Sequence, residues 1–258
     1  MTVDQTHKIF PRVFESTDSI RVEFERNGFV SIKKLLSPDF VNEIASSLRT
    51  LFSSYSHQPE LETDSAIIQL NKNDKKMLHQ LHSAAQRISE LRRIPDVLAP
   101  TVQAISGLKS PVFELSGGFL LGMPEDSRLV YEFHQESNFM KGFSAIYNFH
   151  FPILRDSTTE NGTMSALRGS HKLGTLPFKK EKVSHDSYTN LVPLEIERIK
   201  SDHEEVHFIL EVGDCVVFHQ DLIHRSNFNS STLCRLVGTS RLTQDVPIAW
   251  SPSTSSDL

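Results

Sequence analysis

The spacing of hydrophobic residues changes near position 112 of this chain. Before that point, apolar residues recur every three or four positions, the spacing that places them on one face of an α-helix. Ser37-Pro38-Asp39 is a good helix start, with a capping serine, a proline in the first turn and an aspartate near the positive helix end. The apolar stripe that follows it consists of Val41, Ile44, Ala45, Leu48, Leu51 and Phe52.

Further helices are predicted within residues 18–110. Residues 18–27 favour a short helix that ends at Gly28 and leads into a strand at residues 29–32. The remaining expectations for this part are a helix over 75–93, an interruption at Pro95, a helix over 97–108, and irregular chain over the polar stretch 53–74. The N-terminal part is therefore predicted to be helix-rich.

After residue 112 the pattern changes to short runs of β-branched and aromatic residues separated by turn residues. The expected strands are 113–123 (broken by Gly117-Gly118), the run around His134, 143–154, 163–168, 206–210, 215–219 and 234–241. The long polar stretch 171–205 is expected to be a lid or a binding loop, and the tail 251–258 to be disordered. Helices followed by about eight strands predict a mainly β, α+β fold, a double-sheet barrel with an N-terminal helical buttress.

The composition is that of an ordinary globular protein. Of 258 residues, 38% are hydrophobic and 23% charged, and no linker-like stretch divides the chain, so a single domain over 1–258 is expected. The formal net charge of −5 argues against nucleic acid as a partner. Cys215 and Cys234 are interpreted as buried free thiols of a reducing compartment. No membrane-spanning run or signal-like start is visible, and we expect a cytoplasmic protein of unknown oligomeric state.

Candidate chemistry begins at His134 and Glu136. An extended chain turns residues i and i+2 to the same face, so both side chains can reach one ion. Ninety residues further on, His224 supplies a possible third ligand. Two histidines and one carboxylate form the triad that suits non-haem Fe(II) and leaves positions open. Arg235, eleven residues after His224, could hold a co-substrate carboxylate in a two-bond fork.

These residues resemble those of the phytanoyl-CoA dioxygenase family of Fe(II)/2-oxoglutarate oxygenases. The resemblance extends from about residue 20 to about 242, and one departure is Glu136, where the family usually has aspartate. Its further motifs are Asn27-Gly28-Phe29-Val30, Ser37-Pro38-Asp39, Asn161-Gly162-Thr163-Met164, Gly169-Ser170-His171-Lys172 and His224-x-Ser226 with Arg235.

The resemblance implies a jelly-roll core over about residues 112–242 that binds Fe(II), 2-oxoglutarate and O2. It implies hydroxylation of a small-molecule substrate, with release of succinate and CO2. The resemblance also implies that Arg235 and Ser226 bind the distal carboxylate of 2-oxoglutarate and that Gln135 lines the same pocket. His150 is expected either beside the co-substrate or as an ordinary residue of the barrel interior.

Alternatives remain for several of these residues. The triad could belong to a zinc or manganese site of a cupin-like barrel, or the barrel could bind a ligand without turnover. Halogenation is disfavoured, because halogenases of this type lack the carboxylate ligand. Histidines and carboxylates outside the triad are interpreted as supporting, turn or surface groups: His79, His82, His171, His219 and Asp221.

A basic cluster lies in the polar stretch 171–205. It consists of His171, Lys172, Lys179, Lys180 and Lys182. It is either part of a solvated mobile loop or part of a lid whose cations meet an anionic or polar substrate, such as a carboxylate, phosphate or CoA thioester.

Overall fold

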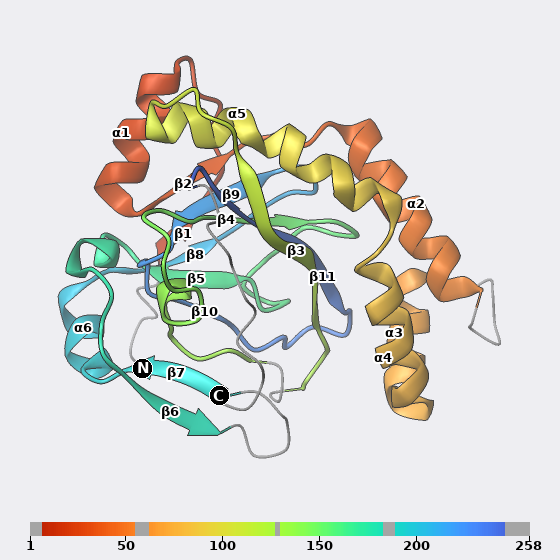
Figure 1. Ribbon diagram of the computed structural model, residues 1–258. Helices are drawn as coiled ribbons and strands as arrows, with labels where there is room; N and C mark the ends of the chain where they lie inside the picture. Colours follow the sequence, from red (N-terminus) through yellow and green to blue (C-terminus); the bar gives the residue numbers. More distant parts are fainter. Residues whose placement is uncertain (1–6, 55–61, 127–129, 183–188, 246–258) are drawn as a thin grey trace.

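The computed structural model describes residues 7–54, 62–126, 130–182 and 189–245 (Figure 1). The N-terminal part forms the expected helical buttress. Its elements are α1 (Thr17–Asn27), α2 (Pro38–Ser53), α3 (Thr63–Asn73), α4 (Lys75–Ala85), the 3-10 helix η1 (Ser89–Arg93) and α5 (Ile94–Ser106).

The starts and ends of these helices follow local chemistry. Ser37 caps α2 by accepting a hydrogen bond from the Phe40 N–H, and Gly28 ends α1 in the left-handed conformation, both as predicted. Two expectations were wrong. Residues 63–73 are helical, and Pro95 lies in the first turn of α5, where its missing N–H costs nothing, instead of breaking a helix.

Two sheets form the core of the fold. The larger one has the order β2-β9-β4-β11-β3, with β2 (Phe29–Ile32), β9 (Cys215–His219), β4 (Tyr147–Pro152), β11 (Arg235–Thr243) and β3 (Phe113–Gly122). The smaller one has the order β1-β8-β5-β10, with β1 (His7–Ile9), β8 (Glu205–Phe208), β5 (Met164–Leu167) and β10 (His224–Ser226). The pairs are antiparallel except β1 with β8.

The helices cover the outer face of the larger sheet, where α1 and α5 lie above the strands in Figure 1. Buried side chains of α2 and α5, such as Leu48 and Leu98, belong to one core with Leu236 and Leu242 of β11. A second core lies between the sheets, where the Phe29 and Phe208 rings pack edge to face at 4.8 Å. The α+β fold with a jelly-roll core and a helical buttress is confirmed.

The glycine pair in β3 does not interrupt the strand as predicted. β3 runs through Gly117 and Gly118, which pair with Ser240 and Thr239 of β11. The absence of a side chain at Gly118 makes room for Gln86 of the helical buttress, whose Oε1 accepts the Phe119 N–H at 2.7 Å. These glycines therefore allow helix and strand to approach closely.

The stretch 171–205, expected to be a loop, contains regular secondary structure. It contains the 3-10 helix η4 (Ser170–Leu173), the hairpin strands β6 (Phe178–Lys182) and β7 (Thr189–Pro193), and the helix α6 (Ile196–Asp202). The tail 251–258 lies outside the described residues. Among the helices that the structure describes, none is long and apolar enough to cross a membrane.

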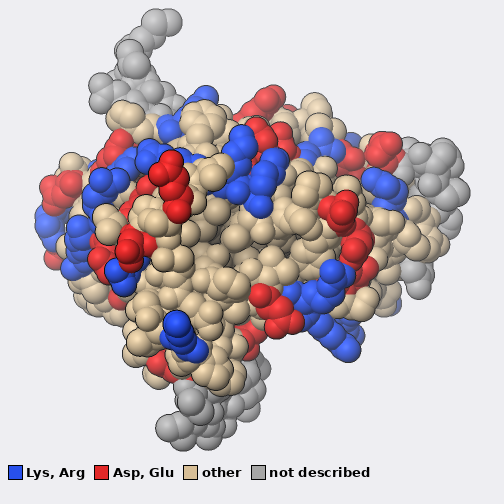
Figure 2. Space-filling model, turned by 90° about the horizontal axis from the view of Figure 1, so that it is seen from above, with Lys and Arg blue, Asp and Glu red and all other residues tan. Residues whose placement is uncertain are grey.

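Charged side chains on the helical face are mixed. Figure 2, which views the molecule from above, shows acidic and basic residues interspersed around a wide uncharged area. This face therefore does not present the continuous basic surface that phosphate backbones require.

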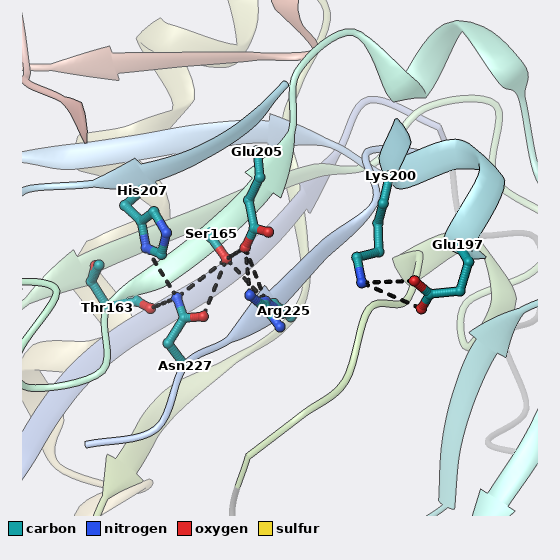
Figure 3. Close-up of polar contacts among 8 residues, drawn as sticks. All are labelled: Thr163, Ser165, Glu197, Lys200, Glu205, His207, Arg225 and Asn227. Atoms are coloured by element: carbon teal, nitrogen blue, oxygen red, sulfur yellow. Dashed lines mark hydrogen bonds and ion pairs between the residues drawn. The ribbon is translucent and has the colours of Figure 1, made fainter. Parts of the chain in front are cut away.

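The outer face of the smaller sheet carries a polar network (Figure 3). Arg225 donates to Glu205 Oε1 from Nη2 at 2.7 Å and from Nε at 3.1 Å. The Ser165 hydroxyl donates to the same oxygen at 2.8 Å, and the Asn227 amide donates to the Thr163 carbonyl. On this face the polar groups satisfy one another.

Candidate metal and co-substrate site

Main-chain hydrogen bonds hold His134 and His224 side by side. The His134 N–H donates to the His224 carbonyl at 3.0 Å, and the His224 N–H donates to the His134 carbonyl at 3.1 Å. This bridge extends β10 towards the His134 segment and places the two imidazole rings 4.3 Å apart. Both histidines are buried. The fold thus fixes two potential ligands that are ninety residues apart in the sequence.

The ring orientation of each histidine follows from its second nitrogen. His134 Nδ1 lies 2.6 Å from the Glu132 carbonyl oxygen, and His224 Nδ1 lies 2.9 Å from the Leu222 carbonyl oxygen. A carbonyl only accepts, so Nδ1 carries the proton in both rings, which leaves the Nε2 lone pair for an ion. Burial, followed by the neighbouring His134, lowers the pKa of His224 and favours this neutral form.

Glu136 completes the triad, although the segment is not a continuous strand as predicted. Gln135 is extended, and Glu136 begins the 3-10 helix η3 (Glu136–Asn138). Glu136 Oε1 lies 3.8 Å from His134 Nε2 and 3.7 Å from His224 Nε2. One ligand atom from each of the three buried residues lies within 4.8 Å of the others. The structure thus brings His134 and Glu136 together, as their i and i+2 spacing predicted, and their role as metal ligands stays a prediction.

Arg241 of β11 holds the Glu136 carboxylate. Its Nε donates to Oε2 at 2.8 Å and its Nη2 donates to Oε1 at 3.1 Å. Burial by itself would raise the pKa of Glu136, but Arg241 and the two histidines hold it well below its usual range. Arg241 was not among the site residues predicted from the sequence. Its position, an even number of residues after Arg235, was the available signal, because side chains of a strand alternate between faces.

Arg235 lies at the start of β11, on the same face as Arg241. It is 6% exposed, and its Nε and Nη1 have no hydrogen-bond partner within the described residues. Burial lowers the pKa of Arg235 to about 10, so the guanidinium remains charged near neutral pH. A buried charge without a partner is costly, and a bound anion would remove that cost.

His150 and Ser226 line the same cavity as Arg235. Burial, together with Arg235 and His224, lowers the pKa of His150 to about 3, and its Nε2 has no partner among the described residues. Ser226 Oγ accepts the Tyr131 N–H at 2.7 Å, which leaves its own hydrogen available to an acceptor in the cavity. These neutral groups can share an acidic ligand with Arg235.

The cavity between the sheets has a volume of about 580 Å³. The triad, Arg235 and Arg241 contribute to its wall, and Lys180, Thr189 and Leu191 reach it from the β6–β7 hairpin. Much of the remaining lining is apolar: Leu115, Leu120, Phe139, Met140, Phe149 and Met164. It has the size and character of a small-molecule site.

Gln135 was predicted to line this cavity, and it does not. An extended residue between His134 and Glu136 points to the opposite side, and Gln135 is fully buried there. Its amide donates to the carbonyls of Gly174 and Asp221, and its Oε1 accepts the Leu176 N–H. Gln135 therefore connects the metal-binding segment to the chain that leads into β6.

Three of the histidines interpreted from the sequence as supporting groups contact backbone atoms outside the triad. The His219 Nδ1 accepts the Asp221 N–H at 3.0 Å, and His171 Nε2 lies 3.1 Å from the Glu25 carbonyl oxygen. His82 Nε2 lies 3.0 Å from the Phe119 carbonyl oxygen. Of the described groups of three or more possible ligands, the His134–Glu136–His224 set is the one compact enough to hold an ion.

The donor set fits Fe(II) and 2-oxoglutarate. Two neutral imidazoles and one carboxylate suit Fe(II), and their placement on one side leaves room for exchangeable ligands. The unpaired Arg235 nitrogens suit a carboxylate in the same cavity. His134, Glu136 and His224 would hold the metal, and Arg235, Ser226 and His150 would contact the co-substrate.

Comparison with known proteins gives the family. The model of the phytanoyl-CoA dioxygenase (PhyH) family matches residues 24–237. The chain therefore belongs to this family of Fe(II)/2-oxoglutarate oxygenases, as its motifs predicted. No curated protein matches the sequence.

Three solved structures of similar fold have low sequence identity to this chain. AviO1 from Streptomyces viridochromogenes Tue57 is 18% identical, with 93% of this chain and 99% of that chain covered and a TM-score of 0.57. The epimerase SnoN, in complex with Fe3+, alpha ketoglutarate and nogalamycin RO, is 17% identical, with 92% of each chain covered and a TM-score of 0.60. EctD from S. alaskensis, with 2-oxoglutarate and 5-hydroxyectoine, is 16% identical, with 94% and 81% covered and a TM-score of 0.60. These likenesses support the fold.

Proposed function

We propose that this protein is an Fe(II)- and 2-oxoglutarate-dependent dioxygenase that hydroxylates a small molecule and releases succinate and CO2. The observation that carries the proposal is the buried triad in one cavity with Arg235, two of whose nitrogens have no partner among the described residues. A cupin-like metal site accounts for the triad, but it gives no reason for a buried arginine without an anion.

When bound, Fe(II) and 2-oxoglutarate supply the activation of O2 that hydroxylation requires. The protein contributes orientation. His134 and His224 present Nε2 to the ion because their Nδ1 protons are held by carbonyls. Arg235 fixes the distal carboxylate of the co-substrate, and Ser226 adds a hydroxyl donor. The apolar lining keeps water away from the reacting atoms.

The hairpin favours a substrate with an anionic group and an apolar part. Lys180 lies at the cavity with no ion pair to a described residue, whereas Lys179, on the other face of β6, pairs with Glu181. Glu136 is the one carboxylate among the described lining residues, and Arg241 already neutralises it. We therefore interpret the β6–β7 hairpin as the substrate-binding part of the predicted lid.

Both cysteines are free and buried, which supports the proposal of a reducing, cytoplasmic location. Burial raises the pKa of Cys234 to about 12, so this thiol is unreactive in the folded protein.

Succinate formation tests the function. Protein reconstituted with Fe(II) and ascorbate should convert 2-oxoglutarate to succinate, and fractions of a cell extract that contain the substrate should accelerate it. Mass analysis of the consumed compound should show the gain of one oxygen atom, and a product without it would indicate another oxidative outcome. Succinate release that is equal in the wild type and in His224→Ala would contradict the proposal.

A further inference from the structure

Glu136, the carboxylate of the triad, has one methylene more than an aspartate. Glutamate has one more rotatable bond, so its carboxylate can occupy more positions and can turn one or both oxygens towards an ion. A glutamate that serves as a fixed ligand needs something to hold its carboxylate plane.

Arg241 contacts both oxygens of that carboxylate. Oε2 accepts the Nε–H at 2.8 Å, and Oε1 accepts from Nη2 at 3.1 Å, the planar fork that only arginine provides. Oε1 is also the oxygen that lies 3.7 Å and 3.8 Å from the Nε2 atoms of His224 and His134. The fork therefore turns Oε1 towards the two histidines and keeps Oε2 on the guanidinium.

We propose that Arg241 is a positioning residue that makes Glu136 a metal ligand through one oxygen. The inference rests on the proposed function, because it assigns the ion to the triad. With Oε2 held by Arg241, the protein contributes three ligand atoms and not four. This leaves more of the coordination sphere to the co-substrate and O2.

Arg235 cannot substitute for Arg241 in this role. The two arginines are six residues apart on one strand, which separates their Cα atoms by about 20 Å. They reach the cavity from different parts of β11. Arg235 has two nitrogens with no partner among the described residues, and Arg241 is bound to Glu136. The strand thus carries separate cations for the co-substrate and for the metal ligand.

A double-mutant cycle on metal affinity tests the proposal. Calorimetric titration with Mn(II), a redox-stable substitute for Fe(II), is carried out on the wild type, Arg241→Met, Glu136→Asp and the double variant. Arg241→Met should weaken Mn(II) binding at least tenfold. Aspartate is too short to reach both the ion and Arg241, so removing Arg241 in the Glu136→Asp background should change the affinity less than threefold.

Arg155→Met is the matched control. Arg155 contacts the buried Asp64 at 2.7 Å and neither residue lines the cavity, so this variant also removes an arginine from a buried carboxylate. Its Mn(II) affinity should stay within twofold of the wild type. If Arg241→Met does not fold, Arg241→Lys replaces it, since an ammonium keeps the charge but not the fork, and it should lose at least threefold.

Unchanged Mn(II) affinity in the Arg241 variant, or an equal loss in both backgrounds, would overturn this inference alone. A wild-type protein that binds neither Mn(II) nor Fe(II) would overturn the proposed function together with it.

Discussion

Arg225 and Arg235 lie on neighbouring parts of the same barrel and have different surroundings. Arg225 of β10 borders the cavity, but it donates two hydrogen bonds to Glu205, within a network that includes Ser165 (Figure 3). Arg235 points into the cavity, is more deeply buried, and has two nitrogens without a described partner. The outer network stabilises the fold by itself, while the inner arginine is arranged for a ligand.

His207 differs from His134 and His224 in the same way that Arg225 differs from Arg235. His207 belongs to the outer network, where Asn227 Nδ2 lies 3.4 Å from its Nδ1. His134 and His224 use only Nδ1 within the protein and turn Nε2 towards Glu136. At the cavity these groups are therefore available to a ligand, whereas the groups of the outer network contact one another. Five predictions test this comparison, from the largest expected effect to the smallest.

Removing a triad histidine should have the largest effect. His224→Ala should lower Fe(II) or Mn(II) affinity at least a hundredfold, about 2.7 kcal/mol, and abolish turnover, because two ligands do not hold the ion. Glu136→Ala should also be inactive, whereas Glu136→Asp should keep measurable activity. His207→Ala in the outer network is the control, and a comparable loss of metal affinity there would break the comparison.

Arg235→Lys should raise KM for 2-oxoglutarate at least tenfold, about 1.4 kcal/mol, because an ammonium cannot reproduce the two-bond fork. The measurement is succinate formation at varied 2-oxoglutarate. Arg225→Lys should leave this KM within twofold. An unchanged KM in the Arg235 variant would mean that another cation binds the distal carboxylate.

His150 should make the metal-free protein acid-sensitive. Its folded pKa of about 3 lies below the ordinary value of 6.5, so the unfolded chain takes up a proton first as pH falls. The folded state therefore loses stability from about pH 6.5 down towards pH 3. Between pH 6.5 and 5.5, His150→Gln should lose about 1 kcal/mol less unfolding free energy than the wild type in urea titrations. Equal losses would show that His150 is not held neutral.

Methionine in place of Arg235 and methionine in place of Arg225 should change the unfolding free energy in opposite directions. Arg235→Met should raise the unfolding free energy of the metal-free protein by about 1 kcal/mol, because it removes a buried charge with no acidic partner among the described residues. Arg225→Met should lower it by about 1 kcal/mol, because Glu205 loses two hydrogen bonds. Urea unfolding without ligands measures both, and a destabilised Arg235→Met would indicate that the guanidinium is satisfied within the protein.

Lys180→Ala should have the smallest effect. It should raise KM for the true substrate about threefold at low salt and less at high salt, since an exposed cation is screened. Lys179→Ala on the opposite face of β6 is the control. Substrate-independent turnover of 2-oxoglutarate should stay unchanged in both. An equal response of the two lysine variants would remove Lys180 from the site.

Strong local signals made much of the fold predictable. The cap at Ser37 and the apolar stripe that follows it defined α2, and Gly28 marked the end of α1. The helix α3 was missed because its N-cap Glu62 makes no side-chain capping bond and few of its positions are apolar. The β6–β7 hairpin was missed because its lysines do not show the alternation of a half-buried strand.

The site was predictable where sequence spacing sets direction. The i and i+2 rule predicted that His134 and Glu136 lie together. The eleven-residue separation of His224 and Arg235 in the sequence predicted that both lie at one cavity. The Gln135 prediction failed because the same alternation turns that residue away. Arg241 was missed because its partner is 105 residues away, a contact that only the pairing of β11 with its neighbours creates.

The most direct test of the central claim is a calorimetric titration of 2-oxoglutarate into anaerobic, Fe(II)-loaded protein. One molecule should bind per chain, with at least tenfold lower affinity in Arg235→Lys and wild-type affinity in Arg225→Lys. Absence of binding to the Fe(II)-loaded wild type, or equal affinity in all three proteins, would contradict the assignment of the triad and Arg235 to one metal and co-substrate site.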